Sequence, residues 1–246
     1  MYPTRKEKRM SEKESEKESE NISMMNMLKL GVHFGHKKAK KHPKMDEYIF
    51  TIRNGINILD LSKTITKLEE ATKYVKEIAA NNGVIIFVGT KRQAKKVVKE
   101  AAEKCGMPYV TERWLGGTFT NFEKIVTSIK RLETMIEQKE SGELEKRYNK
   151  KERLEIDREI IRLEKKFGGI RNMKKLPEAI FIVDIKEDET ALIESRSKNI
   201  PTIAIVDTNV DPSLINRPIP ANDDAVGSIR IIVNAISDAI IEAKKQ

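Results

Sequence analysis

The amino-acid sequence predicts a doubly wound α/β domain that carries an inserted antiparallel helical hairpin. Three continuous apolar runs bounded by turn residues, Gly83–Thr90, Ala179–Ile185 and Thr202–Thr208, are typical of parallel strands that are covered on both faces. A helical pattern follows each run, as expected when strands and helices alternate around one sheet. Two matching apolar stripes lie between the first and second of these strand–helix units, and they indicate an insertion rather than a further unit of the sheet.

The N-terminal part of the chain differs in composition from the rest. Residues 1–21 repeat a Ser-Glu-Lys-Glu pattern with almost nothing apolar to bury, so we expect a disordered arm. Residues 22–246 are expected to form the α/β domain, which begins with a short apolar helix over residues 22–30.

Two short strands and a long helix are expected before the main sheet. Residues 48–61 read as two strands around Asn54-Gly55, because this dipeptide readily supplies the positive φ of a tight hairpin turn. The segment Ser62–Ala80 has apolar residues at spacings of three and four, which predicts a helix with one apolar side that lies on the sheet.

Helices are expected at Lys91–Lys104, Asp188–Lys198 and Asp223–Lys244, one after each apolar run. A further short strand is expected at Tyr109-Val110, because Gly106 ends the helix that precedes it.

The inserted hairpin is expected at about residues 121–169. Its two stripes step by four, three and four residues, and they consist of Ile125, Ile129, Leu132 and Ile136, then Ile156, Ile160, Leu163 and Phe167. This pattern predicts a coiled coil with a polar tip at Ser141-Gly142, closed at its base by Gly168-Gly169. An arm of that length projects about 25 Å and is suited to touch a partner, although it could also serve as a structural brace.

Positive charge is concentrated along the chain. The 47 basic and 38 acidic residues give a net charge of +9, which favours an anionic partner such as nucleic acid. Lys29 to Lys44 contains six lysines and no carboxylate, and Lys91 to Lys99 contains five basic residues and again no carboxylate. Arg171, Lys174 and Lys175 form a third, smaller group.

Composition also argues against several other classes. A single cysteine, Cys105, excludes an internal disulfide and a cysteine-rich zinc site, so we expect a reducing compartment. No apolar run approaches the roughly 20 residues that cross a bilayer, and no signal peptide is recognisable, so no membrane association is expected.

All three histidines lie in one basic stretch, Gly31 to Lys44. A metal site made by His33, His36 and His42 is one reading, but five lysines beside it oppose a dication. Acid–base catalysis is a second reading, although no adjacent carboxylate is available to orient an imidazole. The interpretation that we prefer is a surface that faces a polyanion.

Polar residues at the strand ends are the best argument for an enzyme. Thr90, Asp184 and Asp207 fall just past apolar strands, where open α/β sheets bind ligands, and two aspartates could hold Mg²⁺ or act on phosphate. The segment "VGTKRQ" has neither glycine-rich phosphate-binding spacing, and aspartates at such junctions are ordinary turn residues.

A cationic row is expected on the helix after the first strand. Positions 92, 95, 96 and 99 share one helical face and suit a phosphate backbone, although a solvated face is the alternative. The only tryptophan, Trp114, is expected to fill the space between hairpin and sheet rather than to stack on a base.

Several long motifs resemble the bacterial family of ribosomal small-subunit protein two. They are "GVHFGH", "VGTKRQA", "ERWLGGTFTNF", "GGIRNMKKLPEAIFIVD" and "IPTIAIVDTNVDP", and the resemblance runs from about Met27 to Ile241. It departs at His42, where relatives usually have Asn, and in the N-terminal arm.

This resemblance implies a flavodoxin-like sheet with a coiled-coil insertion, no catalytic activity and no cofactor, metal or small-molecule substrate. It implies a structural component of the cytoplasmic small ribosomal subunit that binds 16S rRNA, contacts neighbouring ribosomal proteins and helps to dock the largest small-subunit protein. The expected RNA-binding residues are His33, His36, Lys37, Lys38, Lys40, Lys41, Lys44, Arg92, Lys95, Lys96 and Arg113. The alternatives are a phosphate-handling α/β enzyme that uses Asp184 and Asp207, and a coiled-coil adaptor that does not bind RNA.

Overall fold

A computed structural model describes residues 23–245, and the predicted N-terminal arm therefore lies outside the described residues. Its helices are α2 (Met24–Lys29), α3 (Leu61–Ala80), α4 (Lys95–Cys105), α5 (Phe122–Glu140), α6 (Glu143–Arg147), α7 (Lys150–Phe167), α8 (Glu189–Ser197) and α9 (Val226–Lys244). Its strands are β1 (Phe34–Lys37), β2 (Ile49–Arg53), β3 (Ile56–Leu59), β4 (Ile85–Val88), β5 (Tyr109–Val110), β6 (Ala179–Ile182), β7 (Thr202–Val206) and β8 (Arg217–Pro220).

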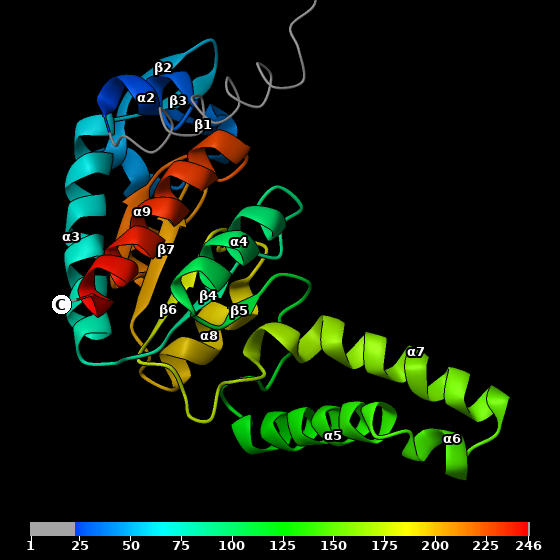
Figure 1. Ribbon diagram of the computed structural model, residues 1–246. Helices are drawn as coiled ribbons and strands as arrows, with labels where there is room; N and C mark the ends of the chain where they lie inside the picture. The colour runs from blue at the N-terminus through cyan, green and yellow to red at the C-terminus, as the bar shows by residue number, and fades with distance from the viewer. Residues whose placement is uncertain (1–22, 246) are drawn as a thin grey trace, which may run out of the picture.

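The main sheet has five parallel strands in the order β5-β4-β6-β7-β8. Numbered along the chain within this sheet, the order is 2-1-3-4-5, which is the flavodoxin-like arrangement of a doubly wound sheet. The sheet passes through the middle of the molecule with helices on both sides (Figure 1). The prediction of a parallel α/β fold is therefore confirmed.

Two apolar cores cover the two faces of this sheet. Successive side chains of a strand point to opposite faces, so Ile85 and Phe87 of β4 join one core while Ile86 and Val88 join the other. The first core is completed by α3, α4 and α9, and the second by α8 and the base of the inserted helices. Burial on both faces explains why these strands are apolar throughout.

A second, antiparallel sheet of three strands has the order β1-β3-β2. The expected turn at Asn54-Gly55 joins β2 to β3, and both residues have positive φ, 49° and 74°. Strand β1 was not expected from the sequence. It is only four residues long and contains Gly35, which lies so close to Thr208 that an added Cβ would be 2.5 Å from a methyl group.

Helices α5 and α7 extend from the α/β body and are joined by α6 (Figure 1). The apolar stripes meet as expected, with Ile129, Leu132 and Leu163 buried between the helices. The tip differs from the sequence prediction, because Gly142 is followed by the short helix α6, whose Leu144 is also buried. Whether the two helices supercoil stays a prediction.

Two elements of the main domain differ from the expectations. The basic helix begins at Lys95 rather than Lys91, so Lys91 and Arg92 precede it. Strand β8 was missed because its sequence is Arg-Pro-Ile-Pro, and proline cannot donate to a ladder. The structure places β8 at the edge of the sheet, where this missing donor is tolerated.

Candidate functional site

The carboxyl ends of β4 and β6 meet at the position where open α/β sheets bind ligands. Lys91 follows β4 and reaches across this position. Its Nζ lies 3.0 Å from Asp184, 2.8 Å from Asp223 and 2.7 Å from Asp224. Burial alone would lower the pKa of Lys91, but hydrogen bonds to these carboxylates outweigh it and raise the pKa. A permanently charged side chain of the protein itself therefore occupies the usual ligand position.

His36 of β1 adds a second connection to the same edge. Its Nδ1 lies 3.1 Å from the buried carboxylate of Asp207 and its Nε2 lies 3.7 Å from Asp224. The hydrogen bond to Asp207 raises the pKa of His36. The backbone amide of His36 also donates to Thr208 Oγ1 at 2.9 Å. His36 thus joins the three-stranded sheet, called the small sheet below, to the end of β7.

One group of residues in the described part of the chain could hold a cation. His36, Asp207 and Asp223 bring one donor atom each within 4.8 Å of one another, and Asp207 Oδ2 is buried without a hydrogen-bond partner. This set differs from the three histidines considered from the sequence. His42 instead accepts from the Lys44 amide, and His33 packs on Phe34 with ring centroids 4.1 Å apart.

Asp184 and Asp207, the aspartates of the enzyme alternative, accept hydrogen bonds from neighbouring residues and stabilise turns. Asp184 Oδ1 accepts from the amides of Lys186 and Glu187 at 2.8 and 3.1 Å, which caps the turn after β6. Asp207 accepts from the Thr208 hydroxyl at 3.0 Å and pairs with His36. Both are buried, with 6% and 1% of their surface exposed. These contacts are the expected ones for turn aspartates.

The basic segment Lys37–Lys44 contains cations with and without acidic partners. The side chains of Lys37, Lys38 and Lys40 are exposed, and within the described residues no carboxylate lies within 4.0 Å of their ammonium groups. Lys41 pairs with Asp46, and Lys44 pairs with Asp211 at 2.8 Å. Two of the five predicted lysines of this segment therefore have acidic partners that the sequence pattern did not reveal.

The row expected on α4 is also partly paired. Lys95 lies 3.1 Å from Glu112, and Lys96 lies 3.8 Å from Glu100 of the next helical turn. Lys96 keeps 82% of its side chain exposed, and such exposed pairs contribute little free energy. Arg92 is exposed at the turn before α4, so the expected single row of four cations on one helix is wrong in detail.

Arg113 and Trp114 follow β5, where a buried carboxylate fixes the loop. Glu194 of α8 accepts from the amides of Gly117 and Phe119 at 2.7 and 2.8 Å, and from Trp114 Nε1 at 3.3 Å. Trp114 is buried edge-on against Phe119, which supports the packing role expected for it. Arg113 is exposed beside it.

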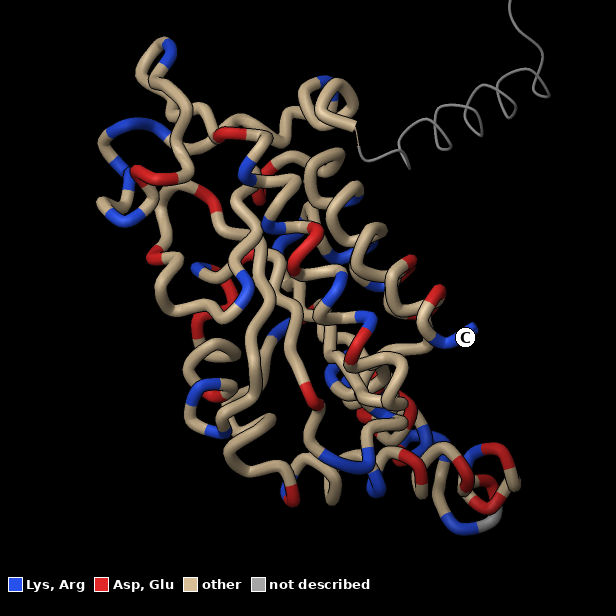
Figure 2. Tube along the Cα trace, turned by 90° about the vertical axis from the view of Figure 1, so that its left-hand side faces the viewer, with Lys and Arg blue, Asp and Glu red and all other residues tan. Residues whose placement is uncertain are grey.

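The predicted RNA-binding residues do not form one uniformly positive face. Asp224 lies between Lys91 and His36, and Lys40 is close enough to contribute to its lowered pKa, so the loop after β1 and the start of α4 are neighbours. Arg113 lies after β5, at the opposite edge of the sheet from β8. Figure 2 shows basic and acidic positions interspersed along the trace.

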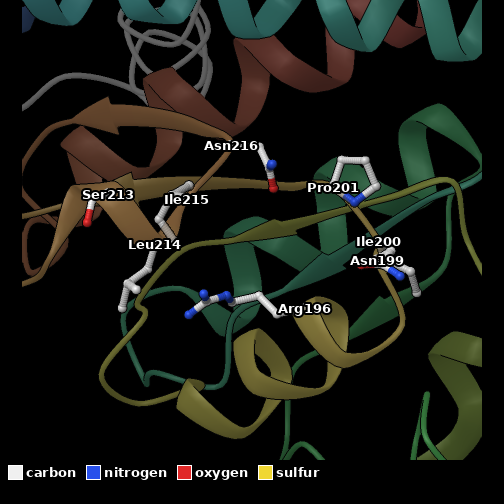
Figure 3. Close-up of a pocket in the computed structure, with 8 residues that line it drawn as sticks. All are labelled: Arg196, Asn199, Ile200, Pro201, Ser213, Leu214, Ile215 and Asn216. Atoms are coloured by element: carbon white, nitrogen blue, oxygen red, sulfur yellow. The ribbon is translucent and has the colours of Figure 1, made fainter.

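A separate hollow of about 510 Å³ lies at the amino ends of β7 and β8 (Figure 3). It is lined by Arg196, Asn199, Ile200, Pro201, Ser213, Leu214, Ile215 and Asn216. None of the predicted site residues lines it, and Asn216 Oδ1 already accepts from the Thr202 amide at 2.9 Å.

None of the helices in residues 23–245 has the length and apolar character needed to cross a bilayer. The family model described as Ribosomal protein S2 matches residues 27–243, which include both sheets and the inserted helices. That family is non-enzymatic and has a structural role in the small ribosomal subunit during translation. Because the match covers nearly the whole sequence, the chain belongs to the ribosomal protein S2 family.

Proposed function

We propose that this chain binds 16S rRNA in the cytoplasmic small ribosomal subunit through exposed cations near the carboxyl edge of the main sheet. The observation that carries this proposal is the exposed group of Lys37 at the end of β1 and Lys38 and Lys40 in the turn that follows, none of which has a carboxylate within 4.0 Å among the described residues. Arg92 lies exposed at the start of α4, beside the same edge. Cations without neighbouring carboxylates are suited to neutralise the phosphates of an RNA backbone.

The other predicted residues differ in how strongly they are engaged by acidic partners of the protein itself. Lys96 can exchange its exposed partner Glu100 for a phosphate, because exposed ion pairs are weak. Lys44 and Lys95 have half-buried partners, Asp211 and Glu112, and are proposed as weaker contacts. Lys41, like Lys96, has an exposed partner, Asp46, and Arg113 adds an exposed cation on the far side. His33 and His36 are also proposed as RNA contacts, and both have further contacts within the protein. Burial lowers the pKa of His33, while His36 is engaged by Asp207.

The experiment is a salt titration of binding to a 16S rRNA transcript. Replacing Lys37, Lys38 and Lys40 by Gln should reduce the slope of log K against log salt concentration by about two to three. The matched control replaces Lys73, Lys186 and Lys198, which are also exposed but lie on other elements. Equal slopes for the two triple variants would contradict the proposal.

We further propose that the chain contributes to docking the largest small-subunit protein. The small sheet offers a surface for a protein contact, because Phe50 and Ile52 of β2 lie two residues apart on one side of the strand and are 75% and 41% exposed. Purified subunits carrying Phe50→Ser should retain less of that protein in sedimentation. Ile193→Ser on α8, at another exposed apolar residue (60%), is the control and should leave retention unchanged.

The adaptor alternative assigns the same docking to the hairpin alone. This alternative, in which the chain does not bind RNA, requires that deletion of residues 123–166 abolish partner binding while neutralising the lysines has no effect. The proposed function expects that neutralising the lysines weakens rRNA binding.

A further inference from the structure

The connection between β7 and β8 differs from the other connections of the main sheet. Parallel strands are usually joined by a helix, and α8 is such a helix between β6 and β7. The connection over residues 207–216 contains only a 3-10 turn, Pro212–Leu214. Val210 and Ile215 of this segment belong to the same core as Leu192 of α8, so the segment and α8 lie on the same face of the sheet.

The hollow at the amino ends of β7 and β8 lies beside α8, where this connection lacks a helix (Figure 3). We call it the amino-end hollow. Its volume of about 510 Å³ is within the usual range of binding sites in proteins. Ile200 and Ile215 are each 7% exposed and form its apolar base, whereas Leu214 is 37% exposed at its side. The hollow therefore combines apolar surface with the polar side chains that line the rest of it.

The charge of the amino-end hollow comes from Arg196 alone, because none of its lining residues is acidic. Figure 3 shows this side chain extended from α8 toward the connecting segment. Among residues 23–245, the guanidinium of Arg196 has neither a hydrogen bond nor a carboxylate within 4.0 Å. The acidic residues of the connecting segment are engaged elsewhere, Asp207 by His36 and Asp211 by Lys44. An anionic group in the hollow would thus meet a cation without competition.

We infer that the amino-end hollow binds an acidic segment of another protein of the small subunit, with a carboxylate on Arg196 and an apolar side chain against Leu214. The planar guanidinium presents its donors in a geometry that matches a carboxylate, and arginine is enriched in protein interfaces. The side-chain amide nitrogens of Asn199 and Asn216 supply further donors for the carbonyl groups of such a segment. This inference goes beyond the proposed function and does not depend on the proposed RNA contacts.

An RNA segment is a poorer fit to the amino-end hollow. Proteins hold an RNA backbone with several cations, each of which neutralises a phosphate. The hollow offers one cation, and the neighbouring Lys198 does not line it. A phosphate also gains nothing from the apolar surface of Ile200, Leu214 and Ile215, whereas the side chains of a protein segment can bury it.

Photo-crosslinking in purified small subunits identifies the occupant. A photo-reactive amino acid at position 199, which is exposed and lines the hollow, is introduced into the full-length chain before the subunits are assembled. The expected product is a crosslink to a protein segment in which Asp or Glu lies beside an apolar residue. The same group at the exposed position 73 of α3 is the control and should not give this product.

A synthetic peptide with the crosslinked sequence is the probe for the second measurement. Arg196→Glu should weaken binding of this peptide to the full-length chain by about tenfold or more, because it places like charges together. Lys198→Glu makes the same change of charge outside the hollow and should weaken binding by less than about threefold. Replacing the acidic residue of the peptide by Lys should restore binding to the Arg196→Glu chain, as expected for a direct pair.

Several results would overturn the inference. They are crosslinks from position 199 only to rRNA or to a second copy of this chain, no product beyond that of position 73, and equal effects of Arg196→Glu and Lys198→Glu on peptide binding. These results leave the proposed function intact. Arg196→Glu should change the salt slope of rRNA binding by less than one, whereas the variant of Lys37, Lys38 and Lys40 should reduce it by about two to three.

Discussion

Lys91 is the residue on which the charge balance of the sheet edge depends. Three carboxylates from two segments, Asp184 after β6 and Asp223-Asp224 before α9, lie within 3.0 Å of its Nζ, and Asp184 and Asp223 are buried. Buried carboxylates are costly unless a cation compensates them. Lys91 supplies this compensation, and it thereby connects the turns after β4 and β6 with the turn before α9.

Replacing Lys91 by Met should lower the free energy of unfolding by about 3–5 kcal/mol at neutral pH, because removal of one partner leaves buried like charges without compensation. Lys96→Met in the same basic segment is the control. Lys96 is 82% exposed, so its replacement should change stability by less than about 0.5 kcal/mol. Urea unfolding of the two variants measures the difference, and equal stabilities would contradict this role of Lys91.

Asp188 makes the stability of the protein dependent on pH. Burial is the main cause that raises its pKa from 3.8 to about 6, against hydrogen bonds donated by the amide and hydroxyl of Thr90. Between these two pH values the folded state holds a proton that the unfolded state has released. This group therefore destabilises the fold progressively as the pH rises from about 4 to 6, and its effect is constant above that.

Asp188→Asn removes this titration while keeping an oxygen that can accept from Thr90. The stability of the variant relative to the wild type should increase between pH 4 and 7, by up to about 3 kcal/mol. Unfolding at a series of pH values measures this difference, and other carboxylates cancel in the comparison. A difference that does not change with pH would show that the pKa of Asp188 is not raised in the folded protein.

At the scale of elements, the hairpin has its own local stabilisation. Asn149 and Glu152 form a capping box at the start of α7, with both hydrogen bonds at 3.0 Å. Lys139 of α5 pairs with Asp157 of α7 at 2.7 Å near the tip. Most of the free energy that stabilises the hairpin is nevertheless expected from burial of the apolar residues between α5 and α7, because exposed ion pairs contribute little.

Leu132→Ala should lower the free energy of opening of the hairpin by about 2–4 kcal/mol, because Leu132 is fully buried between α5 and α7. Leu154→Ala is the matched control on the outside of α7, where 50% of the side chain is exposed. Amide hydrogen exchange of α5 and α7 measures the opening. Similar exchange in both variants would mean that the two helices do not depend on each other.

At the scale of the whole molecule, the three-stranded sheet lies on the carboxyl edge of the main sheet. The amide of His36 in β1 donates to Thr208 Oγ1 at 2.9 Å and connects the two sheets, while Asn57 of β3 donates to the carbonyl of His36 at 2.9 Å within the three-stranded sheet. The close approach requires glycine at position 35, because a Cβ there would lie 2.5 Å from Thr208 Cγ2 and 3.1 Å from the carbonyl oxygen of Asn57.

Gly35→Ala should therefore separate the two sheets locally and lower the unfolding free energy by about 1–3 kcal/mol, the usual range for added atoms in a packed interface. Gly116→Ala is the control, since a Cβ at that position meets nothing within 4 Å. Thermal unfolding measures both variants. If their melting temperatures agree, the two sheets are not in tight contact.

Much of this fold could be predicted from local patterns. The three apolar runs, the Asn54-Gly55 turn and the stripe of α3 all gave elements within a few residues of their observed bounds, because each depends on neighbours along the chain. The elements that were missed, β1 and β8, contain glycine or proline, and they exist because the rest of the sheet provides a partner or an edge for them.

The sequence alone determined which residues are cationic, which strands are buried, and the family to which the chain belongs. Only the tertiary structure decided which cations are free, because Asp211 approaches Lys44 and Glu112 approaches Lys95 from distant parts of the chain. The composition of a segment gives the charge of its side chains, but it does not show which side chains from other segments lie beside them. That Lys37, Lys38 and Lys40 have no carboxylate within 4.0 Å among the described residues is for this reason a property of the fold.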